Sequence, residues 1–225
     1  ESVHDVYGGD TSKYSIVCAF QAFGGINAST QRRLDAGDYV SEGGTPASDW
    51  ATHVCFANYW SAAYYNTATE TTLAATYAGG GEAGDAALTT YVGSSTLAGT
   101  FSLPTLLTHG QDFYALAVTY DKRLCFYEGG YSPDFGGGAE ITAIRSDSRL
   151  HPLMETYELQ NMNSMVDLGE RAEFPSFLGI GGTVSPWGLV DDLYDEPTDD
   201  PRWRAVLAFN GVESETGEIP WIRGG

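Results

Sequence analysis

Short runs of alternating apolar and polar residues, separated by glycine-rich turns, recur along this chain. In residues 14–23, YSIVCAFQAF, both alternating faces carry apolar side chains, which is typical of a strand buried on both sides. Further strands are predicted at residues 52–60 and 61–67. Segments with the 3.6-residue period of a helix are scarce, so the pattern predicts an all-β protein.

Two later stretches extend the β pattern. Residues 71–103 repeat runs of β-branched and aromatic residues around the turn sequence AGGGEAGD, which predicts a meander. Residues 112–130 read DFYALAVTYDKRLCFYEGG, with apolar positions alternating from Tyr114 to Tyr120 and a second strand-like run starting at Arg123. Asp121 and Lys122 between them can turn the chain, so we expect an antiparallel hairpin with a Gly-Gly end.

The rest of the chain is less regular. Residues 24–49 are polar and rich in glycine, as in a long loop. Residues 131–174 lose clear alternation and include one candidate helix, whose expected core contacts are Leu153, Met154, Tyr157 and Leu159. Short strands are predicted at residues 176–182 and 187–197, and a short helical or turn element follows in the tail. No repeat with the period of a solenoid or propeller appears.

In chain order, several segments resemble the concanavalin A-like lectin/glucanase superfamily, which includes the laminin G-like domains. The segment YSIVCAFQAF is similar to an early strand of that family, and FYALAVTYDKRLCFYEGG is similar to its most recognisable hairpin. The segments LGIGG and WGLVDDLYDEP look like its late strands, and VESETGEI looks like its end. The resemblance implies a jelly-roll sandwich of two antiparallel sheets, as one domain over residues 1–225 with a long irregular insert at about 131–175.

Charge restricts the possible partners. Thirty acidic residues face eleven basic ones, which gives a formal net charge of -19. Such a surface repels nucleic acid and anionic membranes, so we expect neither as a partner. The sequence has no long apolar run and shows no signal peptide, so we expect no membrane insertion.

The cysteines Cys18, Cys55 and Cys125 all lie in apolar, strand-like runs and lack the short spacing of a metal or redox site. Buried free thiols are the favoured interpretation. One disulfide with an odd thiol remains the alternative for an extracellular protein, in which Asn27-Ala28-Ser29 is a glycosylation sequon.

Catalytic motifs are not found in the sequence. No strand carries the E-x-D-x-x-E alternation that the hydrolases of the resembled superfamily show, and the adjacent Asp191 and Asp192 point to opposite faces of a strand. The histidines His53, His109 and His151 lie near Tyr, Gln or Arg residues, but their spacing matches no lyase motif. No G-x-S-x-G elbow occurs. We therefore assign no catalytic residue.

Calcium is the metal that the resemblance implies, because many members of that superfamily hold Ca²⁺ in loops at the rim of the sandwich. The stretch DDLYDEPTDDP concentrates the hard carboxylate oxygens that Ca²⁺ prefers. The candidate ligands are Asp191, Asp192, Asp195 and Asp199. A solvated acidic loop is the alternative interpretation of the same residues.

Sugar binding needs aromatic rings that stack on the sugar beside polar groups that hold its hydroxyls. The chain has 14 Tyr and 5 Trp residues, and those that adjoin turns are Trp50, Tyr59, Trp60, Tyr64, Tyr131 and Trp187. The cluster NYWSAAYY is the favoured platform, while packing in the core is the alternative for each ring.

These observations predict a non-catalytic, lectin-like recognition or adhesion domain, extracellular or exposed on a cell or virion surface, that binds a glycan or surface polysaccharide. The first alternative is a structural assembly protein, such as a phage capsid decoration or tail component or a surface-layer or filament subunit, which packs against copies of itself. The second alternative is a polysaccharide lyase or glycosidase.

Overall fold

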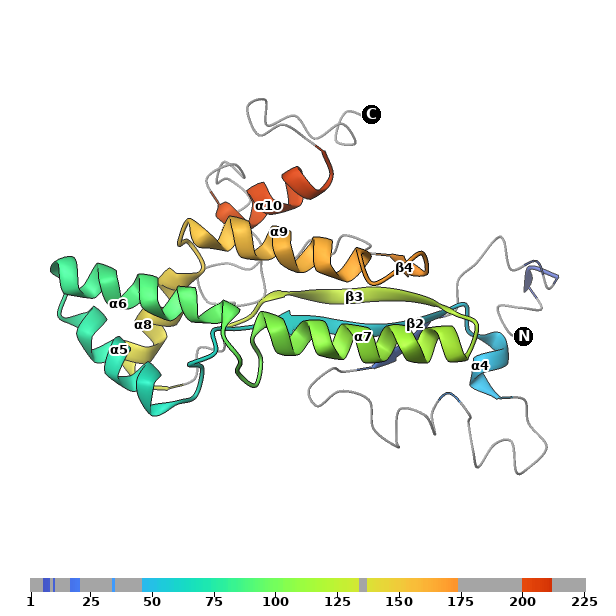
Figure 1. Ribbon diagram of the computed structural model, residues 1–225, viewed down its shortest axis with the longest axis horizontal. Coiled ribbons are helices and arrows are strands. Elements are labelled where there is room, and N and C mark those ends of the chain that lie inside the picture. The colour runs from blue at the N-terminus through green and yellow to red at the C-terminus, as the bar shows by residue number, and fades with distance from the viewer. Residues whose placement is uncertain are drawn as a thin grey trace. The chain divides into compact units, whose positions relative to one another are not determined.

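A computed structural model describes residues 6–8, 10, 17–20, 34, 46–133, 137–173 and 200–211. Helices form most of the described chain, and the strands assemble into a small sheet (Figure 1). In chain order the elements are β1 (Val17–Phe20), α4 (Ala47–Trp50), β2 (His53–Trp60), α5 (Ala68–Ala78), α6 (Gly81–Gly93), η2 (Ser94–Thr96), α7 (Leu103–Thr119), β3 (Arg123–Tyr131), α8 (Ala139–Ser148), α9 (Leu153–Val166), β4 (Ala172–Glu173) and α10 (Pro201–Phe209).

The four described strands lie in the order β1-β2-β3-β4 and run in the same direction. β1 is parallel to β2, and β3 is parallel to β4. Between β2 and β3, the Arg123 amide donates to the Thr52 carbonyl at 3.2 Å where both strands begin, and the Ser132 amide donates to the Trp60 carbonyl at 2.9 Å where both end. The beginnings of the two strands therefore lie opposite each other, as do their ends, so β2 and β3 are parallel as well. We call the edge at which β2 and β3 end the carboxyl edge.

β3 contains one residue more than β2 between these two hydrogen bonds. The chain advances nine residues from Arg123 to Ser132 but only eight from Thr52 to Trp60. The extra residue makes a bulge. Gly130 lies in this part of β3 with a φ of 105°, which side chains of L residues rarely adopt, so glycine is required there.

The chain divides into two compact units, residues 1–58, 108–128 and 165–175 in the first and 59–107, 129–164 and 176–225 in the second. In the first unit, Phe56 of β2 stacks on Phe113 of α7 at 4.6 Å between ring centroids. Phe126 of β3 meets the same Phe56 ring edge-on at 4.9 Å. This aromatic cluster packs α7 against the sheet in the first unit.

The second unit has its own apolar cluster. Its buried members are Ala62, Ala74, Tyr91 and Ile144, with Tyr64, Leu73, Tyr77, Leu88 and Ile141 packed around them. The cluster joins α5, α6 and α8, which gather side by side (Figure 1).

The predicted all-β fold, a concanavalin A-like jelly-roll sandwich with antiparallel sheets, is wrong, because the protein is α/β with a parallel sheet. The predicted hairpin fails in its first half, since residues 112–119 belong to α7. The buried residues of α7 recur at the three- and four-residue spacing of a helix: Leu103, Leu106, Phe113, Leu116 and Ala117. Val118, a core residue in the strand interpretation, is 48 % exposed.

The predicted meander at residues 71–103 and the irregular insert at 131–175 are also wrong. The first contains α5 and α6, and the second contains α8 and α9. α5 starts with an N-cap, in which the Thr67 hydroxyl accepts from the Glu70 amide at 3.3 Å. Alanine is frequent in both α5 and α6 and is the strongest helix former, which outweighs the β-branched residues beside it.

Other predicted elements are confirmed. Residues 52–60 contain β2, residues 14–23 contain β1, and the run that starts at Arg123 is β3. The candidate helix is α9, in which Met154 is fully buried, and the helical element of the tail is α10. The strands predicted at 176–182 and 187–197 lie outside the described residues.

Candidate functional site

The carboxyl ends of β2 and β3 lie side by side. The Trp60 and Tyr131 rings are 4.8 Å apart between centroids, and both side chains are buried, at 1 % and 4 % exposed. Parallel α/β sheets bind their ligands at the edge where the strands end, so this edge is the first place to look for a site.

Glu158 of α9 holds both strand ends. One oxygen, Oε2, accepts from Trp60 Nε1 at 3.1 Å, and the other, Oε1, accepts from the Tyr131 backbone amide. A Cβ atom added at Gly130 lies 3.2 Å from Oε1, so glycine lets the strand approach the carboxylate closely. Because both oxygens accept from protein N–H groups and Glu158 is 4 % exposed, we interpret it as a support for the strand ends.

Burial raises the pKa of Glu158. The hydrogen bonds from Tyr131 and Trp60 and the positive charge of Arg202 oppose this effect, but burial dominates. Arg202 is itself buried and forms an ion pair with Asp200, the N-cap of α10, with Nη2 2.7 Å from Oδ2.

A second buried carboxylate, Glu70 of α5, is compensated differently. Arg145 of α8 donates to it through Nε and Nη2, each at 2.7 Å, and both side chains are at most 2 % exposed. Tyr91 of α6 donates its hydroxyl proton to Oε1 at 2.8 Å, and the backbone amide of Asn66 donates to Oε2 at 2.8 Å. The Arg145 guanidinium also lies 4.3 Å from the centre of the Tyr65 ring. This network ties α5, α6 and α8 together.

Tyr131 connects the network to the strand end. Its hydroxyl oxygen lies 2.9 Å from Ser148 Oγ on α8. Burial raises the pKa of Tyr131 to about 12, and burial likewise raises the pKa of Tyr91. Both hydroxyls therefore keep their protons at neutral pH.

The structure brings together two of the six predicted sugar platforms, Trp60 and Tyr131, although neither ring face is open to solvent. Tyr59 lies in β2, Tyr64 packs against the apolar cluster of the second unit, and Trp50 of α4 is 43 % exposed. Trp187 lies outside the described residues. Sugar contact by these residues stays a prediction.

The predicted calcium ligands Asp191, Asp192, Asp195 and Asp199 also lie outside the described residues. Among the residues that are described, no group of three or more His, Cys, Asp or Glu side chains is placed to hold a metal ion. The same part of the chain contains no helix with the length and apolar character needed to span a bilayer.

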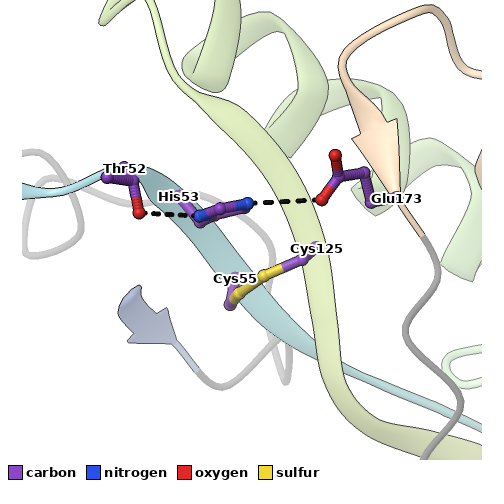
Figure 2. Close-up of a disulfide and its surroundings, with 5 residues drawn as sticks. All are labelled: Thr52, His53, Cys55, Cys125 and Glu173. Carbon is purple, nitrogen blue, oxygen red and sulfur yellow. Dashed lines mark hydrogen bonds and ion pairs between the residues drawn. A yellow bond between two sulfur atoms is a disulfide. The ribbon is translucent and has the colours of Figure 1, made fainter. Parts of the chain in front are cut away.

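A polar cluster ties the strands together where they begin (Figure 2). His53 meets the Thr52 hydroxyl through Nδ1 at 2.8 Å and Glu173 Oε2 through Nε2 at 3.3 Å. Glu173 is also paired with Arg123. Thr, His and Glu in this order resemble a nucleophile, a base and an orienting acid. We interpret the cluster as structural, because Glu173 is shared with an arginine and the amino ends of parallel strands mostly serve stability.

A disulfide joins Cys55 of β2 to Cys125 of β3, with 4.7 Å between their Cα atoms (Figure 2). Cys18 of β1 is free, and burial raises the pKa of its thiol. Of the two alternatives that the sequence left open, the structure has one disulfide and an odd thiol, and the favoured interpretation of buried free thiols is wrong.

Sequence reasoning missed Glu158, Glu70 and Arg145, and it gave Glu128 no role. Glu128 lies in β3 and is followed by Gly129 and Gly130, close to the carboxyl end of the strand. A glutamate before two glycines at the end of a parallel strand is a usable signal, but the hairpin interpretation placed these residues in a loop.

Comparisons with family models, curated proteins and solved structures find no match for this chain.

Proposed function

We propose that this protein is a carbohydrate-degrading enzyme of the glycoside hydrolase type, working at the carboxyl edge of its parallel sheet, with Glu128 of β3 as one of its two carboxylates. The observation that carries the proposal is the position of Glu128 near the end of a parallel strand, directly before two glycines. The lectin-like prediction depended on a jelly-roll fold that the chain does not have. The glycosidase, the second alternative from the sequence, replaces it here because enzymes commonly place their reacting residues at the carboxyl edge of a parallel sheet.

The arrangement of the sheet supports this proposal. Its strands follow one another in the order β1-β2-β3-β4, with helices between them. Enzymes built from parallel strands and helices take their reacting residues from the ends of the strands. Glycines after such a residue let the backbone approach a substrate closely. This support is an analogy between folds. Glu128 adds the carboxyl group that the proposed reaction needs.

Cleavage of a glycosidic bond needs two carboxyl groups. One protonates the leaving oxygen, and the other acts as a nucleophile or activates a water molecule. Glu128 supplies one of them in the proposal, and its partner is left unassigned. Glu158 is not that partner, because protein N–H groups occupy both of its oxygens.

An oxidising, extracellular location fits this role. The Cys55–Cys125 disulfide is typical of proteins outside the cytosol. A net charge of -19 suits contact with neutral polysaccharides better than contact with polyanions.

The test is release of reducing ends from a panel of neutral polysaccharides: cellulose, xylan, mannan, starch, chitin and β-1,3-glucan. We expect the wild type to cleave at least one of them and Glu128→Gln to lose about 10³-fold in rate while staying folded. Glu173→Gln is the matched control, since it makes the same chemical change where the strands begin, and it should keep its activity. Equal rates for the two variants contradict the role of Glu128.

A non-catalytic carbohydrate-binding protein is the second candidate. The exposed ring of Trp50 in α4 favours it. Affinity electrophoresis against the same polysaccharides separates the two. Retardation of the wild type without any release of reducing ends supports binding alone, whereas neither retardation nor release contradicts both functions.

A further inference from the structure

In the described chain, α7 directly precedes β3 and α9 directly precedes β4, and three further helices follow the ends of β2 and β3. α5 and α6 lie between the end of β2 and α7, and α8 lies between the end of β3 and α9. Because the connection after a parallel strand starts at the carboxyl edge, all three leave the sheet from the edge of the proposed site. We call α5, α6 and α8 the helical module, since they contact one another and share the apolar cluster of the second unit (Figure 1).

Tyr131, the last residue of β3, is bonded to this module through its hydroxyl group. Ser148 donates its own proton to the Arg145 carbonyl at 2.6 Å, and Tyr91 donates its proton to Glu70 at 2.8 Å. Each hydroxyl has a single proton. Tyr131 is therefore the donor in its contact with Ser148.

Tyr131 also holds the end of β3 in the second unit through its backbone. Its amide donates to Glu158, and the next amide, of Ser132, donates to the Trp60 carbonyl at 2.9 Å. Tyr131 is thus held to the helical module by its hydroxyl group and fixes the end of β3 by its backbone. Glu128 precedes it by three positions in the same strand.

We propose that Tyr131 is a positioning residue of the carbohydrate site: its hydroxyl group, bonded to Ser148 of α8, anchors the carboxyl end of β3 to the helical module. The inference rests on the proposed function. Tyr131 is 4 % exposed, so it acts through the strand that carries Glu128 and does not touch the substrate. This role replaces the sugar-stacking role that its sequence position suggested.

Tyr131→Phe is a clean test, because it removes the donor and leaves no buried donor unpaired. Ser148 and Tyr91 still donate to the Arg145 carbonyl and to Glu70. Tyr77→Phe is the matched control. Tyr77 lies in α5 of the same module and donates to Asp147 of α8, not to a residue of β3.

Amide hydrogen exchange gives the readout that needs no substrate. We expect the amides of residues 129–132 to exchange about tenfold faster in Tyr131→Phe, which corresponds to the loss of one buried hydrogen bond, and at the wild-type rate in Tyr77→Phe. Unchanged exchange in Tyr131→Phe, or an equal increase throughout α5 and α6, overturns the inference, because the hydroxyl then anchors nothing or merely stabilises the module.

Kinetics on the polysaccharide that the wild type cleaves test the positioning role. We expect kcat of Tyr131→Phe to fall about tenfold with little change in KM, since the reacting groups are misplaced while binding persists. An unchanged kcat overturns the inference. If the wild type cleaves no polysaccharide but residues 129–132 still respond, the proposed function has failed while the anchor stands, so the two failures are distinguishable.

Discussion

Buried carboxylates show how individual residues are stabilised in this protein. Glu70 is matched by a bidentate arginine and further donors, so its negative charge is balanced by an equal positive charge. Glu158 has N–H donors on both oxygens but, among the residues that the structure describes, no ion pair like that of Glu70, and burial dominates its pKa.

The stability that Glu158 contributes is expected to fall as pH rises. Its pKa is raised in the folded protein, whereas an unfolded glutamate ionises near about 4.3. Below that pH the contribution is fully present. Above it the unfolded chain releases its proton first, and the contribution is lost as pH rises through the folded pKa.

Urea unfolding of the wild type and of Glu158→Gln at several pH values between about 4 and 8 measures this effect. The other acidic residues titrate in both proteins and cancel in the difference. We expect the free energy of unfolding of the wild type, relative to the variant, to decrease across this range. A difference that is flat or increases with pH contradicts a raised pKa for Glu158.

At the scale of elements, the strands were easier to predict than the helices. β2 is rich in apolar and aromatic residues and was identified close to its true bounds. The start of β3 at Arg123 was identified too, whereas Gly129 and Gly130 near its end were expected in a loop. α7 was mistaken for a strand because Tyr114, Leu116 and Val118 alternate, although Leu106, Phe113 and Ala117 fall on one helical face. Strand direction could not be read from the pattern, since both faces of these strands are apolar.

The disulfide between β2 and β3 is expected to contribute strongly to stability. It joins residues that are 70 positions apart, and closing a loop of that length stabilises the folded state by about 4 kcal/mol. We expect Cys55→Ala/Cys125→Ala to lower Tm by about 10 °C.

Calorimetry with and without reductant provides the measurement, and Cys18→Ser is the control. Cys18 is a free, half-buried thiol, so its replacement should leave both Tm and the response to reductant unchanged. If reductant does not lower the Tm of the wild type, or if alkylation without reductant labels all three cysteines of the unfolded protein, the disulfide does not form in solution.

At the scale of the whole molecule, the sequence located part of the candidate site but not its chemistry. Trp60 and Tyr131 were selected because they adjoin turns, and the parallel sheet brings them together at its carboxyl edge. Glu158 could not be found, since one glutamate in a helix carries no sign of burial until the partners of the helix are known. Glu70 and Arg145 are 75 positions apart, and only the fold brings them into contact.

We propose that this protein meets carbohydrate at the carboxyl edge of its sheet. Hydrogen exchange of the Glu128→Gln variant, with and without oligosaccharides of the polysaccharide that it binds, tests this most directly. We predict slower exchange at residues 58–61 and 128–133, where β2 and β3 end. Protection confined to residues 52–54 and 121–124, where the same strands begin, would contradict the account.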